Sequence, residues 1–194
     1  VDRGSGSEAS PGGTWNEPDD FVDTLLGEDP HAIVDAVTDA IAEGATSTEL
    51  SSVVAYAAAR RVAQFGTANE FRDWNTVHHT YTYANAVHGA TTRTDAWELY
   101  RGVFDAALNV YLDRFLNMPA AEIPAGDPSA DPEASLDALL DTVDEEGRVD
   151  EAGRHVADYL AAGGAVDALK ARLGGALLRE DADFHTIQNV EAGF

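Results

Sequence analysis

One stretch of the chain concentrates side chains that can bind a metal ion or move a proton. Residues 70–88 hold three of the six histidines of the protein, together with one tryptophan and two tyrosines. If these residues form a helix, one face carries a polar stripe at spacings of three or four residues: Glu70, Trp74, His78, Tyr81, Asn85 and His88. A helix that only covers a core does not need such a face. This histidine stripe therefore predicts a metal or proton-handling site, or a buried polar network.

Helical geometry limits which of these residues can act together. His78 and His88 would lie roughly 15 Å apart along a helix axis, which is too far for both to ligate one metal ion. Glu70 and His78 would be separated by roughly 12 Å, so they could share a metal only if the helix bends, and a break near Asn75 would allow this. The ring of His79 would point away from the stripe by about 100°.

A second group of metal-ligand residue types lies near the C-terminus. Read as a helix, residues 181–191 place Asp181, His185, Gln188 and Glu191 on one face. Helical bundles that bind metals collect carboxylate and imidazole ligands in this way from facing helices. The two groups together predict a mixed site for iron or another divalent metal, with these ligands: Glu70, His78, Asp181, His185 and Glu191. In that site Tyr81 or His88 would be catalytic, because each could orient a ligand or relay a proton.

Simpler interpretations compete with the metal site. A lone histidine on a helix is commonly a hydrogen-bonded core or boundary residue, so the stripe is equally consistent with a structural network or with contacts to a substrate or heme. The aromatic residues around it are expected to pack in the core rather than to form a cofactor box: Trp74, Tyr81, Tyr83, Trp97, Tyr100 and Tyr111. No His-Glu-x-x-His motif, phosphate-binding loop or nucleophile elbow is present in the sequence.

Helix signals dominate the rest of the chain, and no β-branched run alternates over the length of a strand. Capping residues, prolines and glycines delimit helices at about 18–26, 30–44, 46–66, 68–90, 95–117, 133–144, 151–163, 166–178 and 181–192. We therefore expect an all-α protein, a single multi-helix bundle of eight or nine helices over residues 18–194. Residues 1–17 are expected to form a disordered tail, and the proline-rich residues 119–132 a surface loop.

The charge of the chain restricts its environment and its partners. There are 35 acidic and 12 basic residues, for a formal net charge of −23, and Lys170 is the only lysine. Acidic residues occur on nearly every segment, so their mutual repulsion would be relieved by high salt. This composition resembles that of proteins from salt-in halophiles and predicts a high-salt cytoplasm. It also argues against nucleic-acid binding, which needs clustered Lys and Arg. No apolar run approaches the ~20 residues of a transmembrane helix.

The chain contains no cysteine, which excludes disulfides, thiolate metal sites and cysteine-ligated iron–sulfur clusters within it. Any metal must therefore be held by His, Asp or Glu. The sequence starts at Val1 without a methionine and stops directly after a patterned segment. We expect it to be a processed chain or a part of a longer product.

Several blocks resemble a helical domain found with Rieske [2Fe–2S] proteins in haloarchaea and actinobacteria. They are residues 68–74, 78–88, 99–105, 111–117 and 178–185, and the resemblance covers about residues 45–192. It implies a redox setting and a Rieske-type iron–sulfur protein or domain as partner, but it assigns no catalytic residue. The chain lacks the cysteines of a Rieske cluster. A cluster would therefore belong to another segment or to another protein.

Three functional hypotheses follow. The first is a redox-associated domain, a non-heme metal oxidoreductase that works with the Rieske-type partner. The second is a non-enzymatic accessory or assembly subunit, whose His/Tyr/Asn network is structural or contacts another chain. The third is a module that binds a small apolar or aromatic ligand between tyrosine, tryptophan and histidine side chains. A homo-oligomer is a further expectation.

Overall fold

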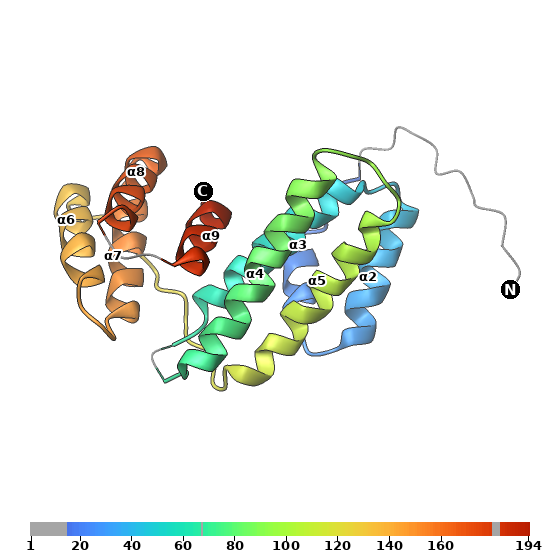
Figure 1. Cartoon of the computed structure of the whole chain (residues 1–194), viewed down its shortest axis with the longest axis horizontal. Helices are drawn as coiled ribbons and strands as arrows, with labels where there is room; N and C mark the ends of the chain where they lie inside the picture. Colours follow the sequence, from blue (N-terminus) through green and yellow to red (C-terminus); the bar gives the residue numbers. More distant parts are fainter. Residues whose placement is uncertain (1–14, 67, 180–182) are drawn as a thin grey trace, which may run out of the picture. The chain divides into compact units, whose positions relative to one another are not determined.

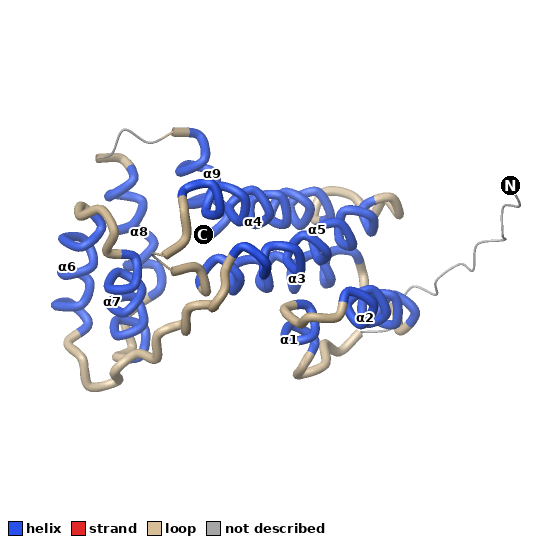
Figure 2. Tube along the Cα trace, turned by 90° about the horizontal axis from the view of Figure 1, so that it is seen from below, coloured by secondary structure: helices blue, strands red, loops and turns tan. Residues whose placement is uncertain are grey.

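The protein is built from helices, as the sequence predicts. The structure, a computed structural model, describes residues 15–66, 68–179 and 183–194. Within these ranges the chain forms nine α-helices, one short 3-10 helix and no strand (Figures 1 and 2). Of the predicted tail, residues 1–17, residues 1–14 lie outside the described residues. Trp15, predicted to lie in that tail, packs edge-on against Phe21 with 5.3 Å between the ring centroids.

The helices have the following bounds: α1 Phe21–Leu25, α2 Pro30–Ala42, α3 Ser47–Ala63, α4 Phe71–Thr91, α5 Leu99–Asp113, η1 Arg114–Leu116, α6 Pro132–Val143, α7 Val149–Ala161, α8 Val166–Leu177 and α9 Phe184–Gly193. The predicted helices agree with these, apart from one to four residues at most ends. The helix of residues 71–91 is continuous, so the break considered near Asn75 does not occur.

Side-chain caps explain where several helices begin. The Asp29 carboxylate accepts a hydrogen bond from the backbone N–H of His31, and Pro30 occupies the first position of α2. Before α3, the N–H of Thr46 donates to Glu49 Oε2 over 2.8 Å, and the N–H of Glu49 donates to Thr46 Oγ1 over 3.2 Å. This reciprocal pair is the capping box that the sequence predicts.

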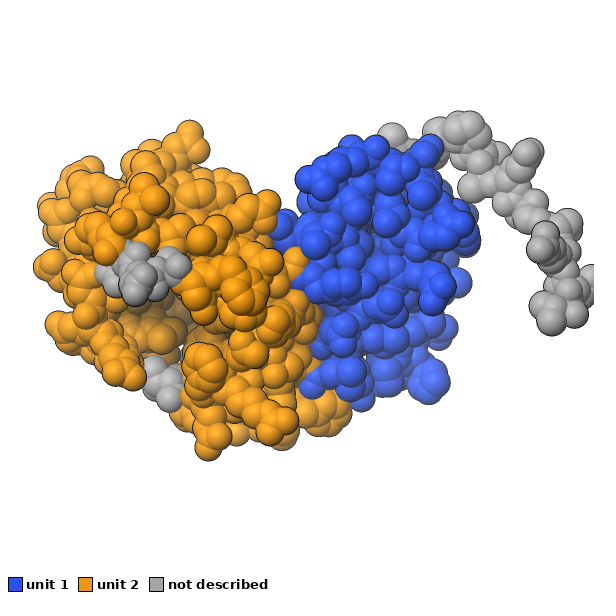
Figure 3. Space-filling view, in the orientation of Figure 1, with its two compact units in different colours: residues 1–58, 83–112 blue, residues 59–82, 113–194 orange. Residues whose placement is uncertain are grey.

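The chain divides into two compact units, coloured separately in Figure 3. Unit 1 contains residues 1–58 and 83–112, and unit 2 contains residues 59–82 and 113–194. The divisions fall inside α3 and α4 and at the end of α5, rather than at the proline-rich loop. Each of these helices therefore contributes residues to both units.

Unit 1 has an aliphatic core with small residues at its helix contacts. Its most buried large side chains are Leu25, Ile33, Val37, Leu50, Val54, Val103 and Val110. Gly102 of α5 packs closely against Val87 of α4, and a Cβ at this glycine would lie 3.0 Å from a Val87 methyl carbon. The Tyr100 hydroxyl donates to the backbone oxygen of Ala45 over 2.9 Å. These contacts tie α4, α5 and the turn before α3 to one another.

Unit 2 contains a helical group, α6–α8, with its own apolar cluster. The cluster comprises Leu136, Leu139, Tyr159 and Leu169, and its buried side chains are the main reason that these helices pack together (Figures 1 and 2). The ring of Tyr159 covers Gly164, where a Cβ would come within 2.4 Å of ring atoms. Only glycine permits this approach.

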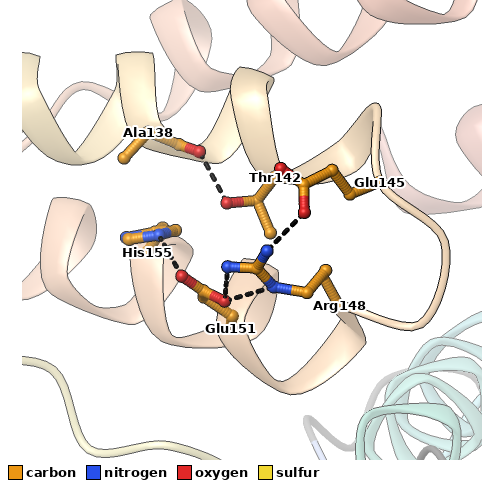
Figure 4. Close-up of polar contacts among 6 residues, drawn as sticks. All are labelled: Ala138, Thr142, Glu145, Arg148, Glu151 and His155. Atoms are coloured by element: carbon orange, nitrogen blue, oxygen red, sulfur yellow. Dashed lines mark hydrogen bonds and ion pairs between the residues drawn. The ribbon is translucent and has the colours of Figure 1, made fainter.

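The turn between α6 and α7 is held by charged side chains. Arg148, which precedes α7, pairs with Glu145 before it and with Glu151 in the first turn of the helix (Figure 4). His155 lies one turn further on, with Nε2 3.9 Å from Glu151. These side chains are partly exposed, so the pairs fix the turn more than they stabilise the fold.

Two aromatic residues expected in the core lie at the surface instead. Trp97 is 66% exposed and its ring packs at a tilt against Tyr100, with 4.8 Å between their centroids. Tyr83 is 40% exposed. The prediction is wrong for both. Trp97 lies in the turn before α5, which begins at Leu99 rather than at residue 95, and Tyr83 lies on a face of α4 that its neighbours leave partly uncovered.

Among the described residues, no helix combines the length and the apolarity that crossing a membrane requires.

Two glycines of unit 2 give a matched test of packing. A Cβ on Gly126 would lie 2.0 Å from the backbone oxygen of Ala157, whereas a Cβ on Gly175 would meet no atom within 4 Å. We expect Gly126→Ala to lower the free energy of unfolding by about 1–3 kcal/mol. Gly175→Ala, inside α8, should raise it by up to about 1 kcal/mol. Urea unfolding at one fixed salt concentration measures both free energies. Equal effects of the two substitutions would contradict the close packing of Gly126 against α7.

Candidate functional site

The buried face of α4 is not the histidine stripe but the row of residues beside it. Val77, Thr80, Ala84, Val87 and Thr91 are buried and recur every three or four residues. The stripe lies at the boundary of this face, so Trp74, His78, Tyr81, Asn85 and His88 are all half-buried. Polar side chains there can contact both the core and a neighbouring element. In unit 2 that neighbour is α9 (Figures 1 and 2).

A pocket of about 710 Å³ lies between the first part of α4 and the C-terminal helices. We call it the α9 pocket. Its walls are Phe71, Trp74, Asn75 and His78 from α4, Leu173, Ala176 and Leu177 from α8, Val143 at the end of α6, and Asp183, His185, Thr186, Asn189, Val190, Gly193 and Phe194 from α9 and its ends. The volume is typical of a site for a small molecule, and most of the lining is apolar.

Three histidines meet beside this pocket. The rings of His79 and His185 are arranged edge to face, with 4.8 Å between their centroids. His78 is close enough to both that their charges would oppose its protonation. His78 also packs against Trp74, with 5.7 Å between the centroids. The site thus combines His78 and His185, as predicted, with His79, which was predicted to point away.

Burial sets the charge state of His78. Desolvation lowers the pKa of its imidazole below 6.5, and His185 and His79 lower that pKa further. The ring is therefore neutral near pH 7. A neutral imidazole has one donor nitrogen and one acceptor nitrogen, so it can bind either kind of polar group.

One polar atom of the pocket residues has no partner. Asn189 Oδ1 is buried, yet no described group donates a hydrogen bond to it. A buried acceptor without a donor costs about 1–3 kcal/mol. Nearby, the carboxylate of Asp183 is occupied, because it caps α9 by accepting from the N–H of Thr186 over 3.0 Å. Asn189 itself lines the pocket and is half-buried, so a turn of its amide about the side-chain torsion would present this unpartnered oxygen to a ligand.

Tyr81 and Glu191 are brought together, but neither lines the α9 pocket. Burial raises the pKa of the Tyr81 hydroxyl, and the Glu191 carboxylate raises it further. The hydroxyl lies beside Gly193, where an added Cβ would be 3.5 Å away. The contact helps to seat the end of α9. The catalytic role predicted for Tyr81 stays a prediction.

His88 is placed in unit 1, where it belongs to a buried hydroxyl cluster. Its Nδ1 lies 3.2 Å from Ser51 Oγ, and Ser51 Oγ lies 2.9 Å from Thr91 Oγ1. A serine beside a histidine is also the arrangement of a nucleophile and its base. Ser51 is only 1% exposed, however, so no substrate could reach its hydroxyl. The cluster joins α3 to α4.

The remaining predicted ligands do not join the two histidines. Glu70 is exposed at the start of α4, where its backbone N–H donates to Asp73, and it is not part of the pocket wall. Asp181 lies outside the described residues. Among the residues that are described, no three His, Asp or Glu side chains are grouped so as to hold a metal ion. The five-ligand metal site stays a prediction, and of its four described residues only His78 and His185 line the same pocket.

A second buried polar group in unit 2 comprises Arg61, Thr80, Asp113 and Asn117. Burial raises the pKa of Asp113, opposed by a hydrogen bond from Thr80 and by the charge of Arg61. Asn117 Nδ2 donates to the backbone oxygen of Gln64, and Asn69 Nδ2 donates to that of Leu116. These contacts join the end of α3 and the first part of α4 to η1, so we assign the group a structural role.

Asn189 and Phe194 line the pocket although neither belongs to the predicted polar stripes. The spacing of Asp181, His185 and Gln188 drew attention to a different face of the C-terminal helix. His185 and Asn189 are four residues apart, which places them one above the other on one helix face, and that spacing could have identified Asn189. No pattern in the sequence indicates that α8 closes the pocket.

Comparison with known proteins gives no further guide: no protein-family model, curated protein or solved structure matches this chain. The resemblance to the Rieske-associated helical domain, and the redox setting that it implies, therefore stay predictions.

The lowered pKa of His78 predicts how stability depends on pH. Because the unfolded chain binds a proton at this position more readily than the folded chain, the free energy of unfolding should fall as the pH drops from about 6.5 through the lower folded pKa. We expect His78→Gln to reduce this loss. His31→Gln, at an exposed position of α2, is the control. Urea unfolding between about pH 7.5 and about pH 5 measures the difference, and parallel curves for the wild type and H78Q would contradict it.

Proposed function

We propose that unit 2 is a binding module for a small, largely apolar molecule that carries a hydroxyl or N–H group. The α9 pocket is the site. The observation that carries this proposal is the buried, unpartnered Oδ1 of Asn189 among the residues that line an otherwise mainly apolar hollow. A ligand donor would satisfy this oxygen, and the apolar walls would favour the rest of the molecule.

The aromatic walls favour a planar ligand. Trp74, His78 and His185 offer ring faces and edges to the pocket, and aromatic pairs prefer such offset or edge-to-face packing. Phe71 and Phe194 line the pocket although they are 87% and 49% exposed, so a bound molecule would cover apolar surface that is now in water.

Charge around the pocket disfavours an anionic ligand. Asp183 lines the pocket, and the chain as a whole carries a net charge of −23. His78 is neutral near pH 7 because burial lowers its pKa, so it supplies no positive charge for a carboxylate or a phosphate. A neutral molecule with one donor group meets all of these conditions.

Binding of β-naphthol and of its methyl ether tests this function. The two molecules have the same ring system, but only the naphthol can donate a hydrogen bond. We expect the naphthol to bind about 5-fold more tightly, as one hydrogen bond to a buried acceptor would give. Asn189→Leu should abolish this preference, and Ala176→Phe, which fills the pocket, should weaken both ligands about 10-fold or more. Calorimetry or ligand fluorescence at high salt measures the affinities.

Two results would contradict the proposal. One is equal binding of the naphthol and its ether to the wild-type protein, which would show that no buried acceptor is used. The other is unchanged binding to Ala176→Phe, which would place the ligand elsewhere. Gln188→Leu is the matched control for Asn189→Leu, because Gln188 is an exposed residue of α9 outside the pocket wall.

A second candidate function is the metal-dependent redox chemistry suggested by the sequence, supported by the proximity of His78 to His185. Two imidazoles form half of a tetrahedral site. Titration with Co²⁺, followed by visible absorption, tests it. If the site exists, His185→Ala should weaken binding about 10-fold or more while His31→Ala leaves it unchanged. Identical titrations of the two variants would exclude a site at His185.

A further inference from the structure

A second hollow in unit 2 shares one wall with the α9 pocket. It has a volume of about 1000 Å³. Its walls are the end of α3, Phe65, Trp74, residues 121–126 and one face of α7 from Val149 to Leu160. We call residues 121–126 the strap and this hollow the strap pocket. Figure 2 shows the loop that contains the strap running past α7 before α6 begins.

The chemistry of the strap pocket favours a neutral, elongated occupant. Its lining follows α7 over roughly 16 Å and consists mostly of Ala, Gly, Val and aromatic residues. The charged residues of the lining are Glu122, Asp150 and Arg154, all of them exposed. Two carboxylates against one guanidinium, in a chain of net charge −23, disfavour an anion.

The strap is hydrogen-bonded at its two ends and lies against α7 at Pro124 and Gly126 between them. The N–H of Ala121 donates to the backbone oxygen of Gln64 over 2.7 Å, and the N–H of Asp127 donates to Asp158 Oδ1 over 2.8 Å. Between these two bonds, no described group forms a backbone hydrogen bond with residues 122–126. Small residues face the hollow from α7. A Cβ on Gly153, for example, would meet only Pro124, at 3.8 Å.

Trp74 connects the two pockets, because its indole lines both. It packs edge-on against Phe65, a strap-pocket residue, with 5.5 Å between the centroids. It also packs against His78, an α9-pocket residue, with 5.7 Å between the centroids. A shift of the indole away from one pocket enlarges that pocket at the expense of the other.

From this shared wall we propose that the strap pocket is a second binding site, for a neutral elongated apolar molecule, and that its occupant opposes ligand binding in the α9 pocket through Trp74. The inference rests on the proposed function for the coupling, but not for the second site itself. Coupling through a shared wall is reciprocal, so each ligand weakens the other by the same factor.

The test uses dodecanol as the strap-pocket probe and β-naphthol as the α9-pocket probe. The protein has three tryptophans, and replacing Trp15 and Trp97 by Phe leaves only Trp74. Because Trp74 lines both pockets, its fluorescence emission reports on both. We expect dodecanol to bind to Ala176→Phe, where the α9 pocket is filled, and to lose about 10-fold or more in affinity in Gly153→Phe. Saturating dodecanol should weaken β-naphthol binding about 3- to 10-fold, which corresponds to a modest coupling energy.

Two further variants guard against effects on folding. Gly175→Phe introduces the same residue into α8 at a position that lines neither pocket, and it should bind both probes as the wild type does. Ile123→Ala shortens an exposed strap side chain, and we expect about 3-fold weaker dodecanol binding with unchanged β-naphthol affinity in the absence of dodecanol.

The outcomes separate the two proposals. Dodecanol affinity that is unchanged in both Gly153→Phe and Ile123→Ala would overturn the second site. Independent binding of the two probes to the wild type would overturn the coupling. Absence of β-naphthol binding would overturn the proposed function and the coupling with it, whereas the dodecanol measurements would still decide whether the strap pocket is a site.

Discussion

The buried face of α4 is narrow, and the internal packing of each unit depends on it. One row of residues, from Val77 to Thr91, is buried, and it is made of small side chains that let other helices come close. The neighbouring row is polar and half-buried. These side chains are partly covered and partly in contact with solvent. A helix that packs beside them therefore meets polar groups that it cannot bury completely. In unit 2, α9 lies against this row without burying any residue of its own, and a hollow remains.

The α9 pocket is distinguished by polar groups that are buried without a complete set of hydrogen-bond partners. The pocket wall holds neutral, half-buried His78 and the residue that carries the Asn189 oxygen, with the edge-to-face pair of His79 and His185 beside it, while acidic groups carry the charge of the surface. The Asp113 group has the same character in part. Its buried carboxyl group accepts a hydrogen bond from Thr80 and lies near the charge of Arg61, and backbone oxygens nearby receive amide donors. Its Oδ2, like Asn189 Oδ1, has no donor among the described residues.

Small residues determine where the elements of unit 2 pack closely and where pockets remain between them. Gly164 and Gly126 allow Tyr159 and the strap to approach their neighbours more closely than any side chain would permit. Gly153 and the alanines of the strap pocket leave space because no large side chain fills it. Trp74, in contrast, is large enough to line two hollows at once, and it contacts a residue of each, Phe65 and His78.

The sequence by itself determined the helices, because periodicity, capping boxes and prolines are local signals that act within a few residues. It also grouped His78 and His185, since both lie on polar helix faces, and both line the α9 pocket. Only the tertiary structure decided that His79 faces His185, that His88 joins Ser51 in the other unit, and that Glu70 stays outside the site. These outcomes depend on how far a neighbouring helix is displaced around and along α4. Successive residues of a helix lie about 100° apart around its axis, so a helix turned by that angle presents different side chains to its neighbour. The local sequence does not determine this angle.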